Sequence, residues 1–397
     1  MSEKVINVGF DFGTSTTKVC LHDLSFGEHY FFCFDKSKND LYRYCIPSIL
    51  SICDGKVYFG ESRNPNAEYK LLKMRIRSDQ DFDLSPYTKT KLKAYQLIAI
   101  YCAGLLSEIN KMIQKNYKNA KIIYQFGIPI DHFNSEPEKE RRFILAFRMA
   151  EYLSRNAELF NNKTDINWFL DRIKNAENEV LNKDEGEQVV VIYPETIAGV
   201  AALFKNNKLT ILKRYSIVDI GAGTTDISFF EFTNFKDFQG RFHVYVSKTL
   251  DCGVENKIPD KDSIEEIRKT FEKGFKNARD KSKEKWSHDF YLLRLGGGNK
   301  TDLKDFSLAA NLSYRENHLN LIELKTIDID KFPIPSSVGE FGNAKENKWM
   351  DYFDLLAISY GLSTPNQSMP TYNPQVPPPL RITSERDHYE PLTPDVG

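Results

Sequence analysis

Two short stretches of this chain place acidic, glycine and hydroxyl residues at a bend between apolar runs. The first extends from Asp11 to Lys18 and reads D-F-G-T-S-T-T-K, and the second extends from Asp219 to Asp226 and reads D-I-G-A-G-T-T-D. Glycine lets backbone N–H groups approach a ligand, and hydroxyl groups can donate hydrogen bonds to phosphate oxygens. Carboxylates at the ends can hold a hydrated cation. Together, these residue types are typical of a site that binds a metal–polyphosphate. For either stretch alone, the alternative is a tight turn that carries polar side chains and binds no ligand.

Apolar runs on both sides of each stretch predict strands. Residues 5–10 and 19–21 flank the first stretch, and residues 215–218 and 227–232 flank the second. Each stretch is therefore expected to form the turn of a β-hairpin. Because the same pattern occurs in both halves of the chain, we expect a duplicated unit whose two turns face one another.

A third glycine cluster, Gly296, Gly297 and Gly298, follows the apolar run 291–295. Glycine has no side chain, so this backbone could lie flat against a nucleoside. The three stretches resemble the phosphate-1, phosphate-2 and adenosine motifs of one superfamily. That superfamily contains actin, the sugar kinases and the seventy-kilodalton heat-shock chaperones.

Two further segments match the connecting helices of that superfamily. Residues 193–202 resemble the first connecting helix, and residues 355–362 resemble the second. The five motifs stand in the family's order along the chain. The resemblance implies an α/β fold with two ribonuclease H-like lobes, which are duplicates of one actin-like unit. It also implies that the two lobes surround a cleft that binds ATP or ADP with Mg²⁺. It is nearest to heat-shock-chaperone nucleotide-binding domains and to bacterial plasmid-segregation actins.

The resemblance also divides the chain into parts. Lobe I would span residues 1–200, with an inserted small subdomain at about 25–115. Lobe II would span residues 201–362, with a small subdomain at about 252–290. The tail, residues 363–397, is rich in proline and poor in aliphatic side chains, so we expect it to be disordered. No segment resembles the peptide-binding domain of the chaperones.

The resemblance implies roles for individual side chains in ATP hydrolysis. Asp11, Asp219 and Asp226 would hold the hydrated Mg²⁺, with Asp219 essential for hydrolysis, and Thr224 would lie near the γ-phosphate. The residues expected to contact the nucleotide are Gly13, Thr14, Ser15, Thr16, Lys18, Gly221, Ala222, Gly223, Thr224, Thr225, Glu272, Lys276, Gly296, Gly297 and Gly298.

Two more residues have implied catalytic roles. Lys73 aligns by position with the chaperone lysine that reaches the transferred phosphate, and Arg75 is the second candidate. Glu195 corresponds to the hinge acid that helps to place Mg²⁺ and the attacking water. The order Pro194-Glu195 differs from the Glu-Pro order of the chaperones and is similar to that of the plasmid-segregation actins. The alternative for Glu195 is an acid at a helix N-terminus, favoured by the helix dipole.

A charged segment at 263–285 is expected to form a helix. By analogy with the chaperones, Glu272 and Lys276 on this helix would contact adenine. Phe275 stands where the family has another basic residue. A solvated helix face is the alternative for these charges.

Composition narrows the classes of function. Lys plus Arg number 54 and Asp plus Glu number 55, for a net charge of −1. This balance gives no reason to expect nucleic acid or an anionic membrane as the main ligand. No apolar run reaches the ~18 residues that a membrane-spanning helix needs. The N-terminus lacks a signal-peptide pattern and the six cysteines form no C-x-x-C pair, so we expect a cytoplasmic protein with reduced thiols.

Hydrophobic periodicity and turn residues predict the other elements. A strand from Pro47 to residue 52 and a second at 56–60 should flank a turn at Asp54-Gly55. Residues 301–348 are expected to be irregular. The remaining expected elements are helices at 88–117, 137–153, 165–181 and 351–362 and strands at 121–126, 189–192 and 241–247.

Three classes of function fit these observations. The first is a Mg²⁺-dependent ATPase that acts as a nucleotide-driven switch or chaperone-like protein. The second is a filament-forming actin homologue, which the Pro194-Glu195 order favours. The third is a small-molecule kinase, since Lys18 stands where sugar kinases often carry a basic residue. The sequence names no protein partner, and self-assembly stays open.

Overall fold

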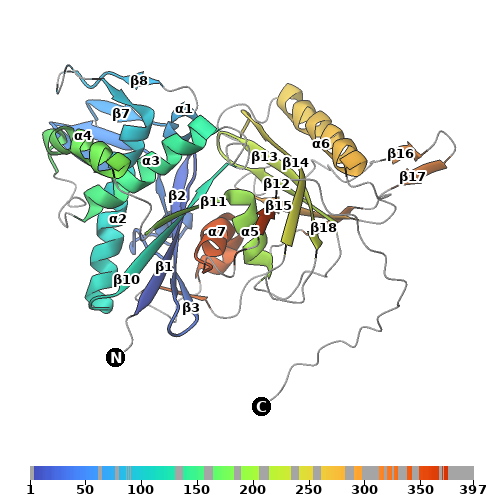
Figure 1. Ribbon diagram of the computed structural model, residues 1–397, viewed down its shortest axis with the longest axis horizontal. Coiled ribbons are helices and arrows are strands. Elements are labelled where there is room, and N and C mark those ends of the chain that lie inside the picture. The colour runs from blue at the N-terminus through green and yellow to red at the C-terminus, as the bar shows by residue number, and fades with distance from the viewer. Residues whose placement is uncertain are drawn as a thin grey trace, which may run out of the picture.

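The computed structural model is a mixed α/β structure with two large sheets side by side (Figure 1). Helices cover the outer faces of the sheets and also lie between them. Among the described helices, none is long and apolar enough to cross a membrane. The structure describes residues 4–60, 65–76, 80–85, 87, 89, 91–129, 137–155, 164–182, 189–204, 214–233, 241–253, 261–281, 290–296, 313–316, 320–323, 326–329, 338–341, 348–365, 369 and 371–373.

The first sheet has the strand order β11-β10-β1-β2-β3-β19. Strands β1, β2 and β3 form an antiparallel meander, and β10, β11 and β19 are added in parallel. A short strand, β4 (Cys45–Pro47), also pairs with β2. The bounds are β1 (Val5–Phe12), β2 (Thr16–Asp23), β3 (Glu28–Phe31), β10 (Lys121–Ile128), β11 (Val190–Pro194) and β19 (Val338–Glu340).

Apart from β4, the described strands of the second sheet repeat this arrangement one for one. Its order is β18-β15-β12-β13-β14-β20, with an antiparallel meander of β12, β13 and β14 and parallel additions on both sides. The first strands of the two meanders, β1 and β12, therefore occupy equivalent places. The bounds are β12 (Arg214–Ile220), β13 (Thr225–Thr233), β14 (Arg241–Leu250), β15 (Phe290–Leu295), β18 (Thr326–Ile329) and β20 (Thr371–Asn373).

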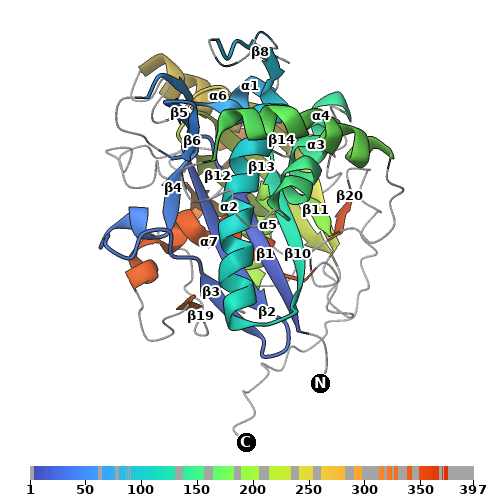
Figure 2. The same ribbon diagram turned by 90° about the vertical axis from the view of Figure 1, so that its left-hand side faces the viewer.

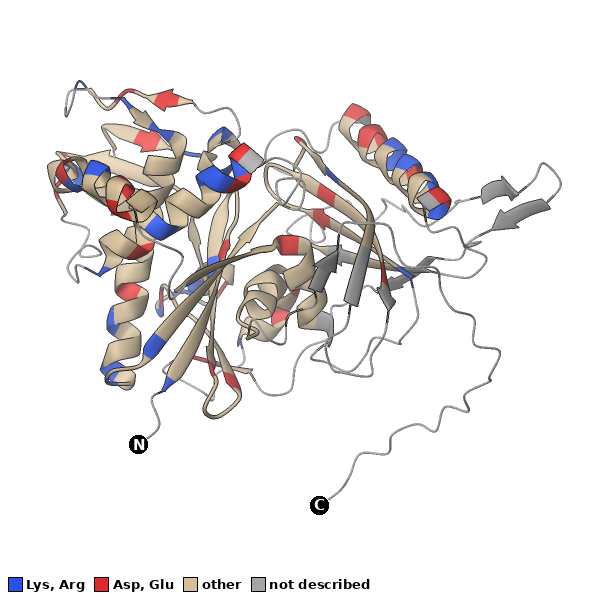
Figure 3. Cartoon of the chain, viewed as in Figure 1, with Lys and Arg blue, Asp and Glu red and all other residues tan. Residues whose placement is uncertain are grey.

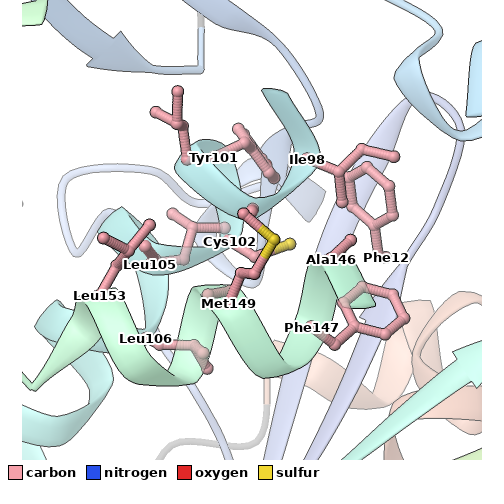
Figure 4. Close-up of a cluster of buried hydrophobic side chains, with 14 of the residues drawn as sticks. Phe12, Ile98, Tyr101, Cys102, Leu105, Leu106, Ala146, Phe147, Met149 and Leu153 are labelled. Atoms are coloured by element: carbon pink, nitrogen blue, oxygen red, sulfur yellow. The ribbon is translucent and has the colours of Figure 1, made fainter. Parts of the chain in front are cut away.

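Helices α2 and α3 cover the outer face of the first sheet, and a third helix, α4, packs on α3 (Figure 2). Their bounds are α2 (Ala94–Asn116), α3 (Pro137–Ser154) and α4 (Ile166–Asn182). Apolar side chains recur on α2 at helical spacing, as at Ile98, Cys102 and Leu105, and they pack against Phe147 and Met149 of α3 (Figure 4). This core supports β1, whose buried residues end beside the first glycine turn.

Two helices, α5 (Glu195–Phe204) and α7 (Phe353–Leu362), lie between the sheets (Figure 1). They cross closely, because a Cβ atom built on Gly361 would lie 1.7 Å from the carbonyl oxygen of Ala198. A Cβ atom on Gly9 of β1 would lie 2.2 Å from the carbonyl oxygen of Ser359. Backbone thus meets backbone on both sides of α7, which fixes this helix against β1 and α5.

The remaining helices are shorter or lie on the second sheet. Helix α6 packs on β13 and β14, the short helix α1 packs on α2, η1 lies beside β4, and η6 lies beside α7. Their bounds are α6 (Lys261–Lys281), α1 (Leu72–Arg75), η1 (Leu41–Arg43) and η6 (Lys348–Tyr352).

The strand predicted from Pro47 to residue 52 is two strands. The N–H of Ser48, which follows β4, donates to the carbonyl of Ser15 at 2.7 Å, and beyond this bond the chain leaves the first sheet. Strand β5 then joins a separate sheet. The predicted turn at Asp54-Gly55 is confirmed, with φ of 50° and 74°. The strands of this sheet are β5 (Leu50–Cys53), β6 (Lys56–Phe59) and β7 (Ala67–Tyr69).

Three other predictions need correction. The helix expected from residue 88 begins at Ala94, because residues 92–93 form β9 (Leu92–Lys93) with β8 (Asp81–Phe82). Residues 301–348, expected to be irregular, contain β18 and β19, which extend the two large sheets, and a small hairpin. The tail contributes β20 to the second sheet, and residues 374–397 lie outside the described residues. The small hairpin is formed by β16 (Ser313–Glu316) and β17 (Asn320–Glu323).

Candidate functional site

The two glycine-containing turns face one another. One connects β1 to β2, and the other connects β12 to β13. A Cβ atom built on Gly223 would lie 2.7 Å from Cγ2 of Thr14, so the two turns are in direct contact. Beside this contact the turns border a cavity of about 330 Å³. Segments from opposite halves of the chain thus share one site.

Most of the residues that the sequence singled out line this cavity. They come from both hairpins, from α1, from the start of α5 and from the end of β15. The lining residues predicted from the sequence are Asp11, Gly13, Thr14, Ser15, Thr16, Lys18, Lys73, Glu195, Asp219, Gly221, Ala222, Thr224, Asp226 and Gly296.

Two lysines, the buried Lys73 and the half-buried Lys18, each face a carboxylate in the cavity. Nζ of Lys18 lies 3.0 Å from Oδ2 of Asp11, and Lys73 donates a hydrogen bond to Glu195. Burial lowers the pKa of Lys18, but Asp11 more than offsets this and the net pKa is raised. The same holds for Lys73, where burial is outweighed by the charges of Glu195 and Asp11. Both side chains therefore stay charged.

The carboxylates of the cavity are crowded enough to disturb one another. Burial, with the charges of Glu195 and Asp11, raises the pKa of Asp219 to about 7. Burial, with the charges of Glu195 and Asp219, raises the pKa of Asp226 to about 8, although a hydrogen bond from Thr249 opposes this. The pKa of Glu195 is also raised, by burial first, against the attraction of Lys73. A cation near these groups would relieve the repulsion.

The spacing of the acids suits a hydrated cation. Within the part of the chain that the structure describes, no three His, Cys, Asp or Glu side chains are placed to ligate one ion directly. Mg²⁺ gives up its waters reluctantly and often binds through only one or two carboxylates. Asp11, Asp219 and Asp226 border the same cavity and could hold such an ion through its water shell.

Comparison of the sequence with protein-family models gives no match, and comparison with curated proteins gives none. The interpretation of the site therefore depends on the residues and their geometry.

Local backbone geometry explains how Lys73 enters the cavity. Leu71 adopts a left-handed conformation with φ of 56° and turns the chain into α1. This conformation is uncommon for a residue other than glycine and often marks a functional site. Arg75, the second candidate, lies over the ring of Phe82 at 5.3 Å and does not line the cavity. Lys73 is therefore the better candidate.

Two predicted contact residues on α6 do not line the cavity. Glu272 and Lys276 are exposed, and charged residues of both signs alternate along the outer face of α6 (Figure 3). The apolar stripe of this helix, including Phe271 and Phe275, packs instead against Phe229 of β13. Glu272 and Lys276 therefore belong to a solvated face of α6, which is the alternative given for them above.

The other predicted residues have different placements. Thr225 is fully buried, and its hydroxyl donates to the carbonyl oxygen of Cys252 at 2.8 Å, so it supports the turn from behind. Gly223 forms the contact with Thr14. Gly297 and Gly298 lie outside the described residues.

Five lining residues were not predicted as site residues: Leu41, Tyr42, Asp354, Leu355 and Ile358. Two belong to η1 and three to the first turns of α7. Leu355 and Ile358 lie in the segment that resembles the second connecting helix, so their general location was predictable. No motif marks Leu41 and Tyr42.

Proposed function

We propose that this protein is a Mg²⁺-dependent ATPase with a duplicated actin-like fold. One observation carries the proposal: equivalent glycine turns of two sheets with the same strand order border one cavity that also holds buried acids and lysines. Backbone N–H groups at glycine turns bind phosphates, and the acids favour a cation. A metal–triphosphate combines the two.

We propose two lobes built around the two sheets, with boundaries near residue 200 and residue 362. The repeated strand order supports the first boundary, whereas around the second one β20, which follows residue 362, still joins the second sheet. Strand β19 joins the first sheet, so the chain would return to lobe I before α7. Helices α5 and α7 would form the hinge, because they lie between the sheets (Figure 1).

Each group in the cavity has a role in this proposal. The two turns would donate backbone N–H groups to the β- and γ-phosphates, with the Thr224 hydroxyl beside the γ-phosphate. Lys73 would exchange Glu195 for a phosphate oxygen, and Glu195 would then accept a hydrogen bond from the attacking water. Bound Mg²⁺ would neutralise charge on the phosphate oxygens. Positioning and charge neutralisation of this kind account for most catalysis of phosphoryl transfer.

Phosphate release from ATP tests the proposal. Wild-type protein should release phosphate in Mg²⁺ and stop when the metal is chelated. Asp219→Ala should abolish release while the circular dichroism spectrum stays unchanged, because this acid faces the cavity in the second hairpin. Unchanged release by Asp219→Ala would remove Asp219 from the site. Absence of both ATP binding and hydrolysis in the wild type would contradict the proposal itself.

A filament-forming actin homologue is the second candidate. The observation that favours it is the order Pro194-Glu195 at the start of α5, which is similar to that of plasmid-segregation actins. Electron microscopy with Mg²⁺–ATP and with Mg²⁺–ADP distinguishes the two. ATP-dependent filaments would support assembly, and a monomer under both conditions would favour the switch.

A further inference from the structure

The cavity has a second wall beyond its charged groups. Leu41 and Tyr42 of η1 form one part, and Asp354, Leu355 and Ile358 of α7 form the other. Half of Tyr42 is exposed, and Leu355 is also partly exposed. This wall presents an aromatic ring, aliphatic side chains and one carboxylate. Such a combination suits a flat heterocycle joined to a polar sugar.

The η1 part of this wall is held rigidly. Arg43 forms a two-pronged ion pair with Glu340 of β19, at 2.7 and 2.9 Å, and donates to the carbonyl oxygens of Lys36 and Lys38. Tyr44 also donates to Glu340, at 2.9 Å. Only 4% of Arg43 and 0% of Glu340 is exposed. A buried pair with such complete hydrogen bonding fixes the segment that carries Tyr42.

The segment that carries Tyr42 is joined both to the first hairpin and to the helices η6 and α7. Strand β4, which follows η1, pairs with residues 16–18 of the first hairpin. On the other side, Lys348 of η6 donates to Asn39 at 2.9 Å, and η6 leads directly into α7. Leu41 and Tyr42 therefore lie between the phosphate-binding turn and the start of α7.

Helix α6 gives no comparable wall within the described residues. Its two candidate residues for binding a base, Glu272 and Lys276, are exposed and do not border the cavity. The apolar face of α6 is used against the second sheet. A nucleoside attached to phosphates at the two turns would find its aromatic and aliphatic contacts at η1 and α7.

We propose that the nucleoside of the bound nucleotide lies against Tyr42, with Leu41, Leu355 and Ile358 around the base and Asp354 accepting a hydrogen bond from a ribose hydroxyl. This inference rests on the proposed nucleotide function. Stacking on an aromatic ring contributes about 1–3 kcal/mol per base, so loss of the ring should weaken binding about fivefold to 150-fold.

Binding of Mg²⁺–ATP and of Mg²⁺–tripolyphosphate, measured by calorimetry, tests the inference. Tripolyphosphate has the phosphates but no nucleoside. Tyr42→Ala should weaken ATP binding about fivefold or more and leave tripolyphosphate binding unchanged, and Tyr42→Phe should restore ATP binding. Phe26→Ala is the matched control, because Phe26 is 66% exposed in the β2–β3 turn and should change neither affinity.

Asp354→Asn tests the ribose contact with the same method. It should weaken ATP binding but not the binding of 2′,3′-dideoxy-ATP, which lacks both hydroxyls. Wild-type affinity for ATP in Tyr42→Ala would overturn the inference and leave the proposed function intact. An equal loss for tripolyphosphate would also overturn it, since Tyr42 would then shape the phosphate site. A wild-type protein that binds neither ligand would remove the proposed function as well.

Discussion

At the scale of single residues, each of the cavity's two lysines is paired with one acid, and within the described part of the chain two further acids form no ion pair with a lysine. Lys18 faces Asp11 and Lys73 faces Glu195. Asp219 and Asp226 instead have raised pKa values, because burial and their acidic neighbours disfavour charge. A cation beside these two acids would relieve their repulsion.

The ion pair between Lys73 and Glu195 predicts that substitutions at these two positions have strongly coupled effects on the free energy of unfolding. Lys73→Met should lower the free energy of unfolding by about 3–5 kcal/mol, because Glu195 is left buried without its cation. Adding Glu195→Gln should restore most of the loss. Urea unfolding of the wild type, both single variants and the double variant measures the coupling. A double variant as unstable as Lys73→Met would contradict the pairing.

The raised pKa values of Asp219 and Asp226 predict how stability depends on pH without metal. The folded protein keeps these protons up to about pH 7 and 8, whereas the unfolded chain loses them near the ordinary value of 3.8. Between about pH 4 and 8 the folded state binds more protons, so the free energy of unfolding should fall as pH rises and then level off. Urea unfolding in chelator at a series of pH values measures this slope.

The control for the pH prediction is the double variant Asp219→Asn with Asp226→Asn. Neither amide titrates, so the fall between pH 4 and 8 should become much shallower. A wild-type stability that rises with pH across this window, or a slope that the double variant does not change, would show that the two aspartates are ionised in the folded protein.

At the scale of elements, the sequence predicted the hairpins best. Acid, glycine and hydroxyl residues between apolar runs specify these turns locally, and both hairpins form as expected. The break after β4 was not predictable, because it depends on tertiary pairing: β4 joins β2 of the first sheet, whereas β5 joins β6 and β7. The placement of Tyr42 depends on Arg43 and Glu340, which are 297 residues apart in the chain. Strands β18 and β19 are short additions at or next to sheet edges, and such strands have weak patterns.

The contact between the two turns predicts the effect of a single methyl group. In Gly223→Ala the new Cβ atom would clash with Cγ2 of Thr14 and with Sδ of Met74, each 2.7 Å away. Methionine can move, so Thr14 is the obstacle. Mg²⁺–ATP affinity should fall about fivefold or more as the turns separate, because overpacking costs about 1–3 kcal/mol.

Adding Thr14→Ser to Gly223→Ala should restore part of the lost ATP affinity. Serine keeps the hydroxyl and removes the methyl group that the new Cβ atom would meet. Calorimetry should therefore show near-normal ATP affinity for Thr14→Ser alone and partial recovery in the double variant. Wild-type affinity in Gly223→Ala would mean that the turns do not need this close approach.

At the scale of the whole molecule, two sheets of the same topology meet through a pair of closely crossed helices. Glycine at positions 9 and 361 lets α7 approach both β1 and α5, so these helices connect the two halves. The cavity lies where the equivalent hairpins face each other. A ligand that both turns hold would join the two halves, and its hydrolysis would loosen that connection.

The most direct test of this account is the stoichiometry of Mg²⁺–ATP binding, measured by calorimetry on the wild type and on one variant in each hairpin. The account predicts one nucleotide per chain. It also predicts that Asp11→Ala in the first hairpin and Asp219→Ala in the second each reduce binding severely, with both variants folded. Two nucleotides per chain, or full binding after either substitution, would contradict a single site shared by the two turns.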